Sequence, residues 1–138
     1  MICVDRRQAF GAGLGAILPG LVSAPPAMAQ SYGPHQGKEL APGVREVFIA
    51  KCEPGFASYR WVWVTDQIFE PGAVLPAAVA VNDMLCHMLG GLLRVKAGDR
   101  EFVAKKDDLW ALPKGRLARR ANTGAEAAIV RVIDLLNW

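Results

Sequence analysis

The sequence has few of the residues that carry most acid–base, nucleophilic and metal chemistry. Histidine occurs twice, at His35 and His87, and cysteine occurs three times in 138 residues. His87 follows Cys86 directly, and adjacent residues of a strand point to opposite faces of a sheet. A Cys–His nucleophile pair is therefore not expected, because its two groups must come within about 3 Å of each other. A catalytic triad is set aside as well.

Clustered basic charge and long apolar runs are also missing. The net charge is +3, and the basic runs are the pairs Arg6-Arg7, Lys105-Lys106 and Arg119-Arg120. Neutralising phosphates requires a clustered basic face, so we expect no nucleic-acid partner. The main apolar stretch, residues 9–22, is shorter than the roughly 20 residues of a membrane-spanning helix.

The N-terminal residues are typical of an export signal. Arg6-Arg7 precedes the apolar stretch, and residues 27–29 read Ala-Met-Ala, an Ala-x-Ala processing site. We therefore expect a cleaved signal peptide over residues 1–29 and a periplasmic or secreted protein with no stable membrane span after cleavage. The single arginine pair leaves Sec and twin-arginine export both open.

The chain does contain one domain with enough apolar residues to bury a core, since 52% of its residues are hydrophobic and 21% are charged. Residues 30–43 are rich in Gly, Pro, Ser and Gln, and we expect a flexible lead-in there. Short β-rich segments separated by turn residues fill 44–138, which indicates an all-β sandwich or barrel. The expected strands are 44–50, 59–65, 74–81, 84–89, 92–97, 101–105, 108–112, 116–121 and 127–136.

Two cysteines, Cys52 and Cys86, remain after the expected cleavage. An oxidising compartment permits a disulfide between them, and two buried free thiols are the alternative. Nothing in the sequence shows that their Cα atoms approach within about 7 Å, so we favour the free thiols.

The turns after residue 70 resemble those of the cupins, small β-barrels of the double-stranded jelly-roll type that are marked by two motifs. The turn residues similar to these motifs are Pro71-Gly72, Gly91, Asp107-Asp108, Pro113-Lys114-Gly115 and Asn122. The resemblance implies a cupin-like double-stranded β-helix over 44–138. Cupin-like barrels often pair through strands, so it also implies a homodimer.

The positions at which the cupin family carries its metal ligands hold other residues here. By the spacing of the motifs, the family's glutamate falls on Met84 and its third histidine on Ala118. The His-x-His pair falls on Ala77 and Val79, or with a shorter spacing on Ala78 and Ala80. A 2-His-1-carboxylate site needs imidazole and carboxylate groups on one face. We therefore expect no metal cofactor, and the family's metal-dependent chemistry is not transferred.

Sulfur is concentrated on the strand expected over 84–89. Met84, Cys86 and Met88 share one face of it, and the resemblance implies that this face looks into the barrel. Soft sulfur ligands select Cu(I), so a copper-binding protein or an enzyme of unusual design is one interpretation. The other is that these residues are adaptable core packers. Whether the protein is an enzyme stays open, and a binding or structural role is favoured.

The same face predicts a ligand pocket. Arg116 and Arg120 each lie two residues from Ala118, so on a strand they point to the same face as Ala118. A guanidinium at the barrel mouth is suited to hold a carboxylate. Two solvated surface arginines are the alternative. We predict an exported barrel that binds a small apolar or amphipathic acid, or that serves as a structural or interaction protein. The predicted pocket residues are Ala77, Val79, Met84, Cys86, Met88, Trp110, Arg116, Ala118 and Arg120.

Overall fold

The computed structural model describes residues 4–5 and 32–138. In this part of the chain every regular element is a β-strand, as the sequence predicts. The same residues hold no helix of the length and apolarity needed to cross a bilayer. The predicted signal peptide over 1–29 lies outside the described residues, except for the two-residue strand β1 (Val4–Asp5), which pairs with residues 50–51.

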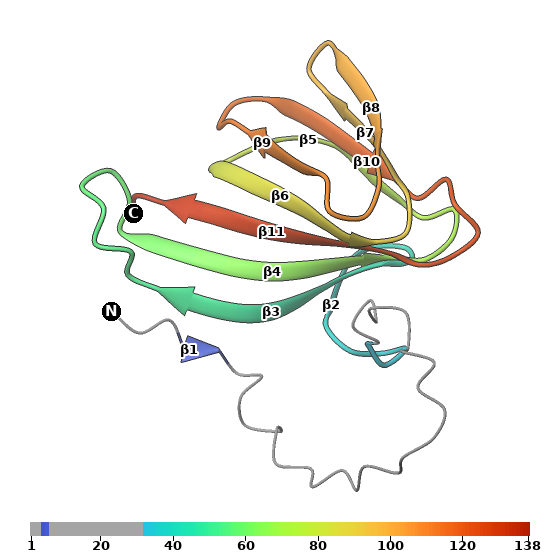
Figure 1. Cartoon of the computed structure of the whole chain (residues 1–138), viewed down its shortest axis with the longest axis horizontal. Helices are drawn as coiled ribbons and strands as arrows, with labels where there is room; N and C mark the ends of the chain where they lie inside the picture. Colours follow the sequence, from blue (N-terminus) through green and yellow to red (C-terminus); the bar gives the residue numbers. More distant parts are fainter. Residues whose placement is uncertain (1–3, 6–31) are drawn as a thin grey trace, which may run out of the picture.

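The remaining strands pack as two layers (Figure 1). They are β2 (Lys38–Ala41), β3 (Val44–Cys52), β4 (Trp61–Phe69), β5 (Val74–Val79), β6 (Asp83–Gly90), β7 (Leu93–Ala97), β8 (Arg100–Ala104), β9 (Leu109–Leu112), β10 (Leu117–Ala121) and β11 (Ala128–Leu136). The larger antiparallel sheet has the order β1-β3-β4-β11-β6-β9, with β2 paired to β3. The smaller sheet has the order β5-β10-β7-β8. β8 and β9 follow each other in the sequence but belong to different sheets.

Most predicted strands agree with the structure within two residues at each end. Two predictions differ. The strand expected over 59–65 runs from Trp61 to Phe69. Part of the lead-in forms β2, which pairs with β3 through a hairpin at Pro42-Gly43, where Gly43 has φ +74°. The Gly- and Pro-rich composition suggested a flexible segment, but here it marks a hairpin turn.

The turns that resemble cupin motifs are fixed by specific contacts. Gly91, after β6, has φ +73°, and a Cβ there would lie 2.6 Å from the backbone oxygen of Ala127. Only glycine fits this position without strain. Asn122, after β10, is 2% exposed, and its amide donates to the carbonyl oxygens of Phe69 (2.9 Å) and Glu126 (2.7 Å).

The hydrophobic core lies between the two sheets. Its largest fully buried apolar side chains are Phe69, Met88, Leu93, Val44, Val95, Val130 and Val132. The larger sheet supplies five of these seven residues, and register places pairs of them side by side, as with Val44 and Phe69 or Val130 and Met88. Burying each such side chain contributes about 1.5–3 kcal/mol, so the core is what holds the two layers together.

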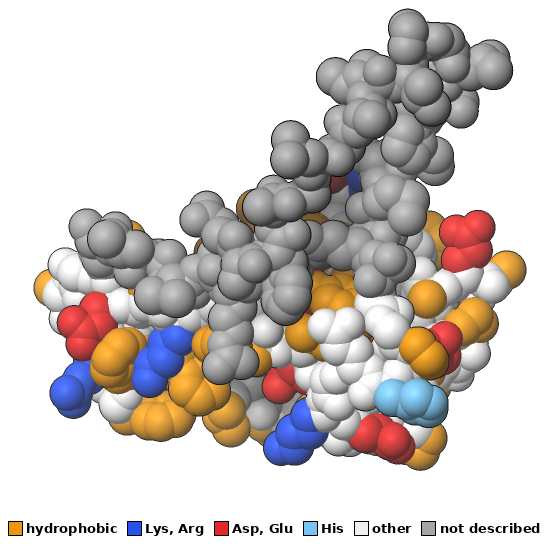
Figure 2. Space-filling model, turned by 90° about the horizontal axis from the view of Figure 1, so that it is seen from below, with side chains coloured by type: hydrophobic (Ala, Val, Ile, Leu, Met, Phe, Trp, Pro, Cys, Tyr) orange, Lys and Arg blue, Asp and Glu red, His pale blue; other side chains and the backbone are white. Residues whose placement is uncertain are grey.

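Part of the larger sheet carries aromatic side chains that remain accessible. Figure 2 shows hydrophobic side chains gathered at the left end of the underside, with basic groups among them. Phe48 and Trp63 meet edge to face at 6.3 Å, and they are 44% and 36% exposed. The Nζ of Lys51 lies 3.8 Å from the ring centroid of Trp61, within cation–π distance.

Candidate functional site: a polar cavity inside the barrel

A cavity of about 200 Å³ opens inside the barrel beside Met84 and Ala118. Ala80, Leu112 and Ala118 form a small apolar cluster at its wall, and Met84 packs against this cluster and against the main core. These residues come from both sheets, so the cavity lies between the layers. The barrel is therefore not completely filled at this position.

Strand β5 and the residue after it bring two alanines to the cavity, Ala78 and Ala80, where Ala77 and Val79 were predicted. Register pairs Ala118 with Ala78, so Ala78 and Ala80 face the cavity. Val79 also lines the cavity although it is 57% exposed, whereas Ala77 is not one of the lining residues. Of the two predicted residues, Val79 therefore lines the cavity and Ala77 does not. The β5–β10 ladder has an irregularity between Ala118 and Arg120.

Arg120 is the cation of the cavity. Its residue is 7% exposed, and its Nη1 donates to Oε1 of Gln67 at 2.6 Å. Among the described residues no carboxylate lies within ion-pair distance of its guanidinium. No buried side-chain nitrogen or oxygen of these residues lacks a partner. The N–H groups of Arg120 that make no protein bond are therefore open to the cavity.

Two carboxylates share this cavity. Gln67 donates from Nε2 to Oε2 of Glu46 at 3.3 Å, so one amide links Arg120 to Glu46 without direct contact between the two charges. Burial raises the pKa of Asp134 above its ordinary value of 3.8. A hydrogen bond from Asn82 opposes that rise, the charge of Glu46 adds to it, and the charge of Arg120 lowers the pKa. The cavity thus combines one cation with two acids.

Cys86 and Met88 were predicted to line the pocket, but they lie in the core. Both side chains are fully buried, and Cys86 is a free thiol as favoured. Cys52 is disulfide-bonded, so the expectation of two free thiols is wrong for that residue. Burial raises the pKa of the Cys86 thiol to about 11. A metal ligand or nucleophile must be a thiolate, so this environment disfavours the copper and cysteine-enzyme interpretations and favours core packing.

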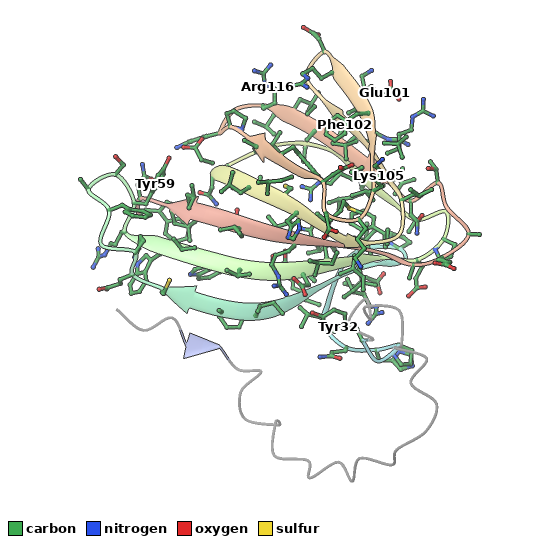
Figure 3. All side chains as sticks on the ribbon, in the orientation of Figure 1. Tyr32, Tyr59, Glu101, Phe102, Lys105 and Arg116 are labelled. Atoms are coloured by element: carbon green, nitrogen blue, oxygen red, sulfur yellow. The ribbon has the colours of Figure 1, made fainter. Side chains whose placement is uncertain are left out.

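Trp110 and Arg116 face a second, larger cavity. Its volume is about 630 Å³, and it lies between β8 and β9. Leu112, which is 2% exposed, lines both cavities and separates them. Figure 3 shows Arg116 and Phe102 together near the β7–β8 hairpin, far from Tyr59 at the opposite end of the molecule. The residues predicted to line one pocket are therefore divided among the interior cavity, this second cavity between β8 and β9, and the core.

Sequence reasoning missed the polar residues of the interior cavity: Glu46, Gln67 and Asp134. The signal that could have found them is the alternation of side chains along a strand, because residues two positions apart point to the same face. Each lies two residues from a buried apolar residue of its own strand, Val44, Phe69 and Val132 respectively. A polar side chain on the core-facing side of a strand is unusual in a filled barrel.

The comparisons with known proteins support the fold. No family model and no curated protein sequence matches the chain. Among solved structures, it is similar to the Cnp3 cupin domain of Schizosaccharomyces pombe, with 22% identity and a TM-score of 0.59 over 68% of this chain. The match spans 65% of the Cnp3 chain, just under two thirds of its length. The chain has the cupin fold.

The chain is similar to two further solved structures. KdgF from Halomonas sp. has 12% identity and a TM-score of 0.58, with 73% of this chain and 86% of that chain covered. An RmlC-like cupin from Shewanella frigidimarina has 12% identity and a TM-score of 0.59, with coverages of 76% and 87%. The predicted resemblance to the cupins is thereby confirmed, and at these identities it concerns the fold alone.

The residues of the interior cavity do not fit the metal ion that cupins commonly hold. Ala78, Ala80 and Ala118 have no ligand atom, and Met84 offers only a thioether. Within residues 4–5 and 32–138 no group of three His, Cys, Asp or Glu side chains is arranged to hold a metal. Arg120 also contributes a positive charge to the lining of the cavity. We derive no metal-dependent step for this cavity.

Proposed function

We propose that this cupin-fold barrel binds a small amphipathic acid in its interior cavity without a metal ion. The observation that carries this proposal is Arg120, a guanidinium that is 7% exposed, is held by a neutral amide and opens into a cavity. A buried charge is costly unless it is paired. A ligand carboxylate would provide the direct ion-pair partner that Glu46 and Asp134 do not, through two parallel hydrogen bonds.

The other residues of the cavity indicate what the rest of the ligand looks like. Leu75, Met84 and Val132 offer an apolar surface, and Glu46 and Asp134 accept hydrogen bonds. A ligand with a carboxylate, a short apolar part and a hydroxyl group matches all three. The cavity of about 200 Å³ is smaller than the roughly 300–1,000 Å³ of drug-sized pockets, so the ligand has only a few carbon atoms.

The test compares Arg120→Met with Arg119→Met, because Arg119 is the adjacent, exposed arginine of β10. The probe is 2-hydroxybutanoate, titrated into ¹⁵N-labelled protein and followed by NMR at the side-chain amide of Gln67. We expect saturable shifts in the wild type and in Arg119→Met, and their loss in Arg120→Met. Equal binding by wild type and Arg120→Met would contradict the proposal, and so would no binding at millimolar concentration.

Thermal unfolding shows whether Arg120→Met has lost binding or folding. A buried charge without a carboxylate partner often costs more than a well-packed apolar replacement. We therefore expect the Tm of Arg120→Met without ligand to be equal to or higher than that of the wild type. A lower Tm would show that Arg120 is retained for stability, which would remove the argument for a ligand.

We also propose that the barrel acts outside the cytoplasm. The support is the signal-like pattern of residues 1–29, with its Ala-x-Ala processing site. Expressing the full chain in bacteria and measuring the mass of the protein in each fraction tests this. Loss of residues 1–29 and recovery from the periplasm or medium are expected, and a full-length protein confined to the cytoplasm would contradict export.

A homodimer completes the proposal. It is supported by apolar side chains that stay accessible, such as Phe48 at 44% and Leu85 at 37% exposure. Exposed apolar patches often mark interaction sites. Light scattering after size exclusion measures the mass directly. A mass that stays monomeric across the micromolar range would contradict a dimer.

A further inference from the structure

The larger cavity lies along the line where the two sheets fail to join. β8 ends the smaller sheet and β9 ends the larger one, and the two strands do not pair with each other. The cavity of about 630 Å³ between these edges, here called the seam cavity, is large enough for a ring system. Leu112 closes its inner end against the interior cavity. The seam cavity is therefore a separate place in the fold.

Two aromatic rings form the floor of the seam cavity. Phe102 of β8 and Trp110 of β9 meet edge to face, with centroids 5.5 Å apart and an interplanar angle of 76°. Both rings are half-buried and pack against the main core, so they are held in place from below. Their upper surfaces remain accessible to the cavity, which they line together. Flat apolar molecules pack well on such a surface.

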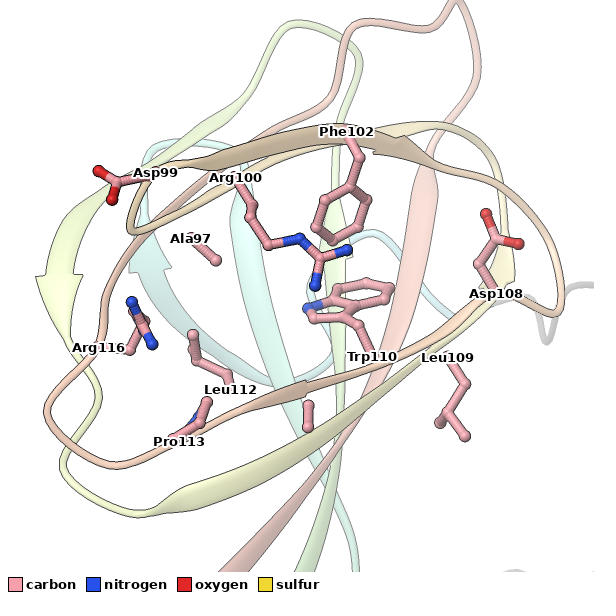
Figure 4. A pocket seen from close by; sticks show the side chains of 11 residues that line it. Ala97, Asp99, Arg100, Phe102, Asp108, Leu109, Trp110, Leu112, Pro113 and Arg116 are labelled. Carbon is pink, nitrogen blue, oxygen red and sulfur yellow. The ribbon is translucent and has the colours of Figure 1, made fainter.

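Two guanidinium groups stand over this floor. In Figure 4 the side chain of Arg100 extends across the middle of the seam cavity towards Trp110 and Phe102, and Arg116 lies at its left side. Arg116 comes from a turn, and it fits closely over Gly98, where an added Cβ would lie 2.8 Å from its Nη1. The two cations thus come from different segments and border one cavity.

Neither arginine is paired in the described part of the chain. No described residue forms a side-chain hydrogen bond or an ion pair with the guanidinium of Arg100 or of Arg116, although the backbone of Arg116 bonds to Ala80 and Pro113. The two acids at the cavity are placed elsewhere: Asp99 points away from it in Figure 4, and Oδ2 of Asp108 accepts the backbone N–H of Lys105 at 2.9 Å. Two cationic donors without a side-chain partner among the described residues, Arg100 and Arg116, therefore border the seam cavity.

We propose that the seam cavity is a second ligand site, which binds an aromatic carboxylate. Arg100 and Arg116 hold the carboxylate, and its ring system packs on Trp110 and Phe102. A guanidinium matches a carboxylate with two parallel N–H groups, and the aromatic floor selects a flat apolar body. This site does not depend on the proposed function of the interior cavity, since it uses none of its charged residues.

The probe is 2-naphthoate, with binding measured by isothermal titration calorimetry on the protein as it is expressed. We expect Arg100→Gln and Arg116→Gln each to weaken binding roughly tenfold or more, as loss of a charge-assisted hydrogen bond does. Arg119→Gln, an exposed arginine of the neighbouring β10, and Arg120→Met are expected to bind like the wild type. Both of the first two substitutions change exposed side chains, so folding is retained and is checked by the Tm.

Two further probes separate the contributions of charge and ring. 2-Naphthol lacks the carboxylate and acetate lacks the ring, so both are expected to bind at least tenfold more weakly than 2-naphthoate. NMR shifts on addition of 2-naphthoate are expected at the indole N–H of Trp110 and not at the side-chain amide of Gln67. The proposal is overturned if 2-naphthoate does not bind, if 2-naphthol binds as tightly, or if the two seam arginines can be replaced without effect.

Discussion

Cys86 illustrates, at the scale of single residues, how burial decides the chemistry of a side chain. Its thiol is fully buried, and burial is the main reason that its pKa rises to about 11. Arg120 lowers this pKa and Asp134 raises it, so the charges of the interior cavity influence a residue of the core. The neutral thiol packs as a small apolar group.

This shift predicts a loss of stability in alkali. In the unfolded chain the thiol ionises near its ordinary pKa of 9.0, whereas in the folded protein it stays neutral up to about pH 11. The stability contributed by the neutral thiol is complete below pH 9 and is lost as the pH rises towards 11. Two pKa units correspond to about 3 kcal/mol in the free energy of unfolding.

Urea unfolding at several pH values between 8 and 11 measures this effect. We expect the free energy of unfolding of Cys86→Ala to fall less steeply with pH than that of the wild type, by about 2 kcal/mol over the range. The substitution leaves a cavity, so only the two slopes are compared and not the absolute values. Parallel slopes would show that Cys86 does not cause the alkaline loss.

At the scale of elements, the connection between β10 and β11 depends on one side chain. Asn122 donates to Phe69 and Glu126, and its Oδ1 accepts the N–H of Gly124 at 2.9 Å. These three bonds fix the end of β10 against the end of β4 and set the path into β11. The neighbouring Thr123 is exposed.

Asn122→Ala is therefore expected to lower the free energy of unfolding by about 2–4 kcal/mol, because buried backbone groups lose their partners. Thr123→Ala is the matched control and is expected to change it by less than about 0.5 kcal/mol. Urea unfolding measures both. Faster hydrogen exchange at the Gly124 amide in Asn122→Ala would place the loss at this turn, and equal stability of the two variants would show that the hydrogen bonds contribute little.

The turns and the cavities of this molecule differ in how far the sequence predicts them. Turns such as Gly91 and Asn122 depend on local geometry, so their residues and spacing were enough to predict the cupin fold. Which residues of a strand face the interior depends on how that strand aligns with strands that are distant in the sequence. On β5, for example, Ala78 and Val79 line the interior cavity and Ala77 does not, and the pairing of β5 with β10 is irregular. The division between the interior and seam cavities depends on which strands pair, and no local pattern records it.

At the scale of the whole molecule, β11 occupies the middle of the larger sheet, between β4 and β6, although it follows every other strand in the sequence. A chain that stops at residue 126 would lose the centre of this sheet and several core residues, including Val130 and Val132. We expect it to lack the near-ultraviolet circular dichroism of a packed protein and to be digested rapidly by trypsin. A chain that lacks only the exposed residues 137–138 is the control, and a folded 1–126 chain would contradict the central role of β11.

The position of β11 also sets the time at which the protein can fold during its synthesis. Until β11 has left the ribosome, β4 and β6 lack the neighbour that lies between them in the sheet. Pairing between segments so far apart in the sequence is slow. The emerging chain therefore cannot complete its larger sheet until synthesis is nearly finished, and chaperones or a secretion machinery have that interval in which to bind it.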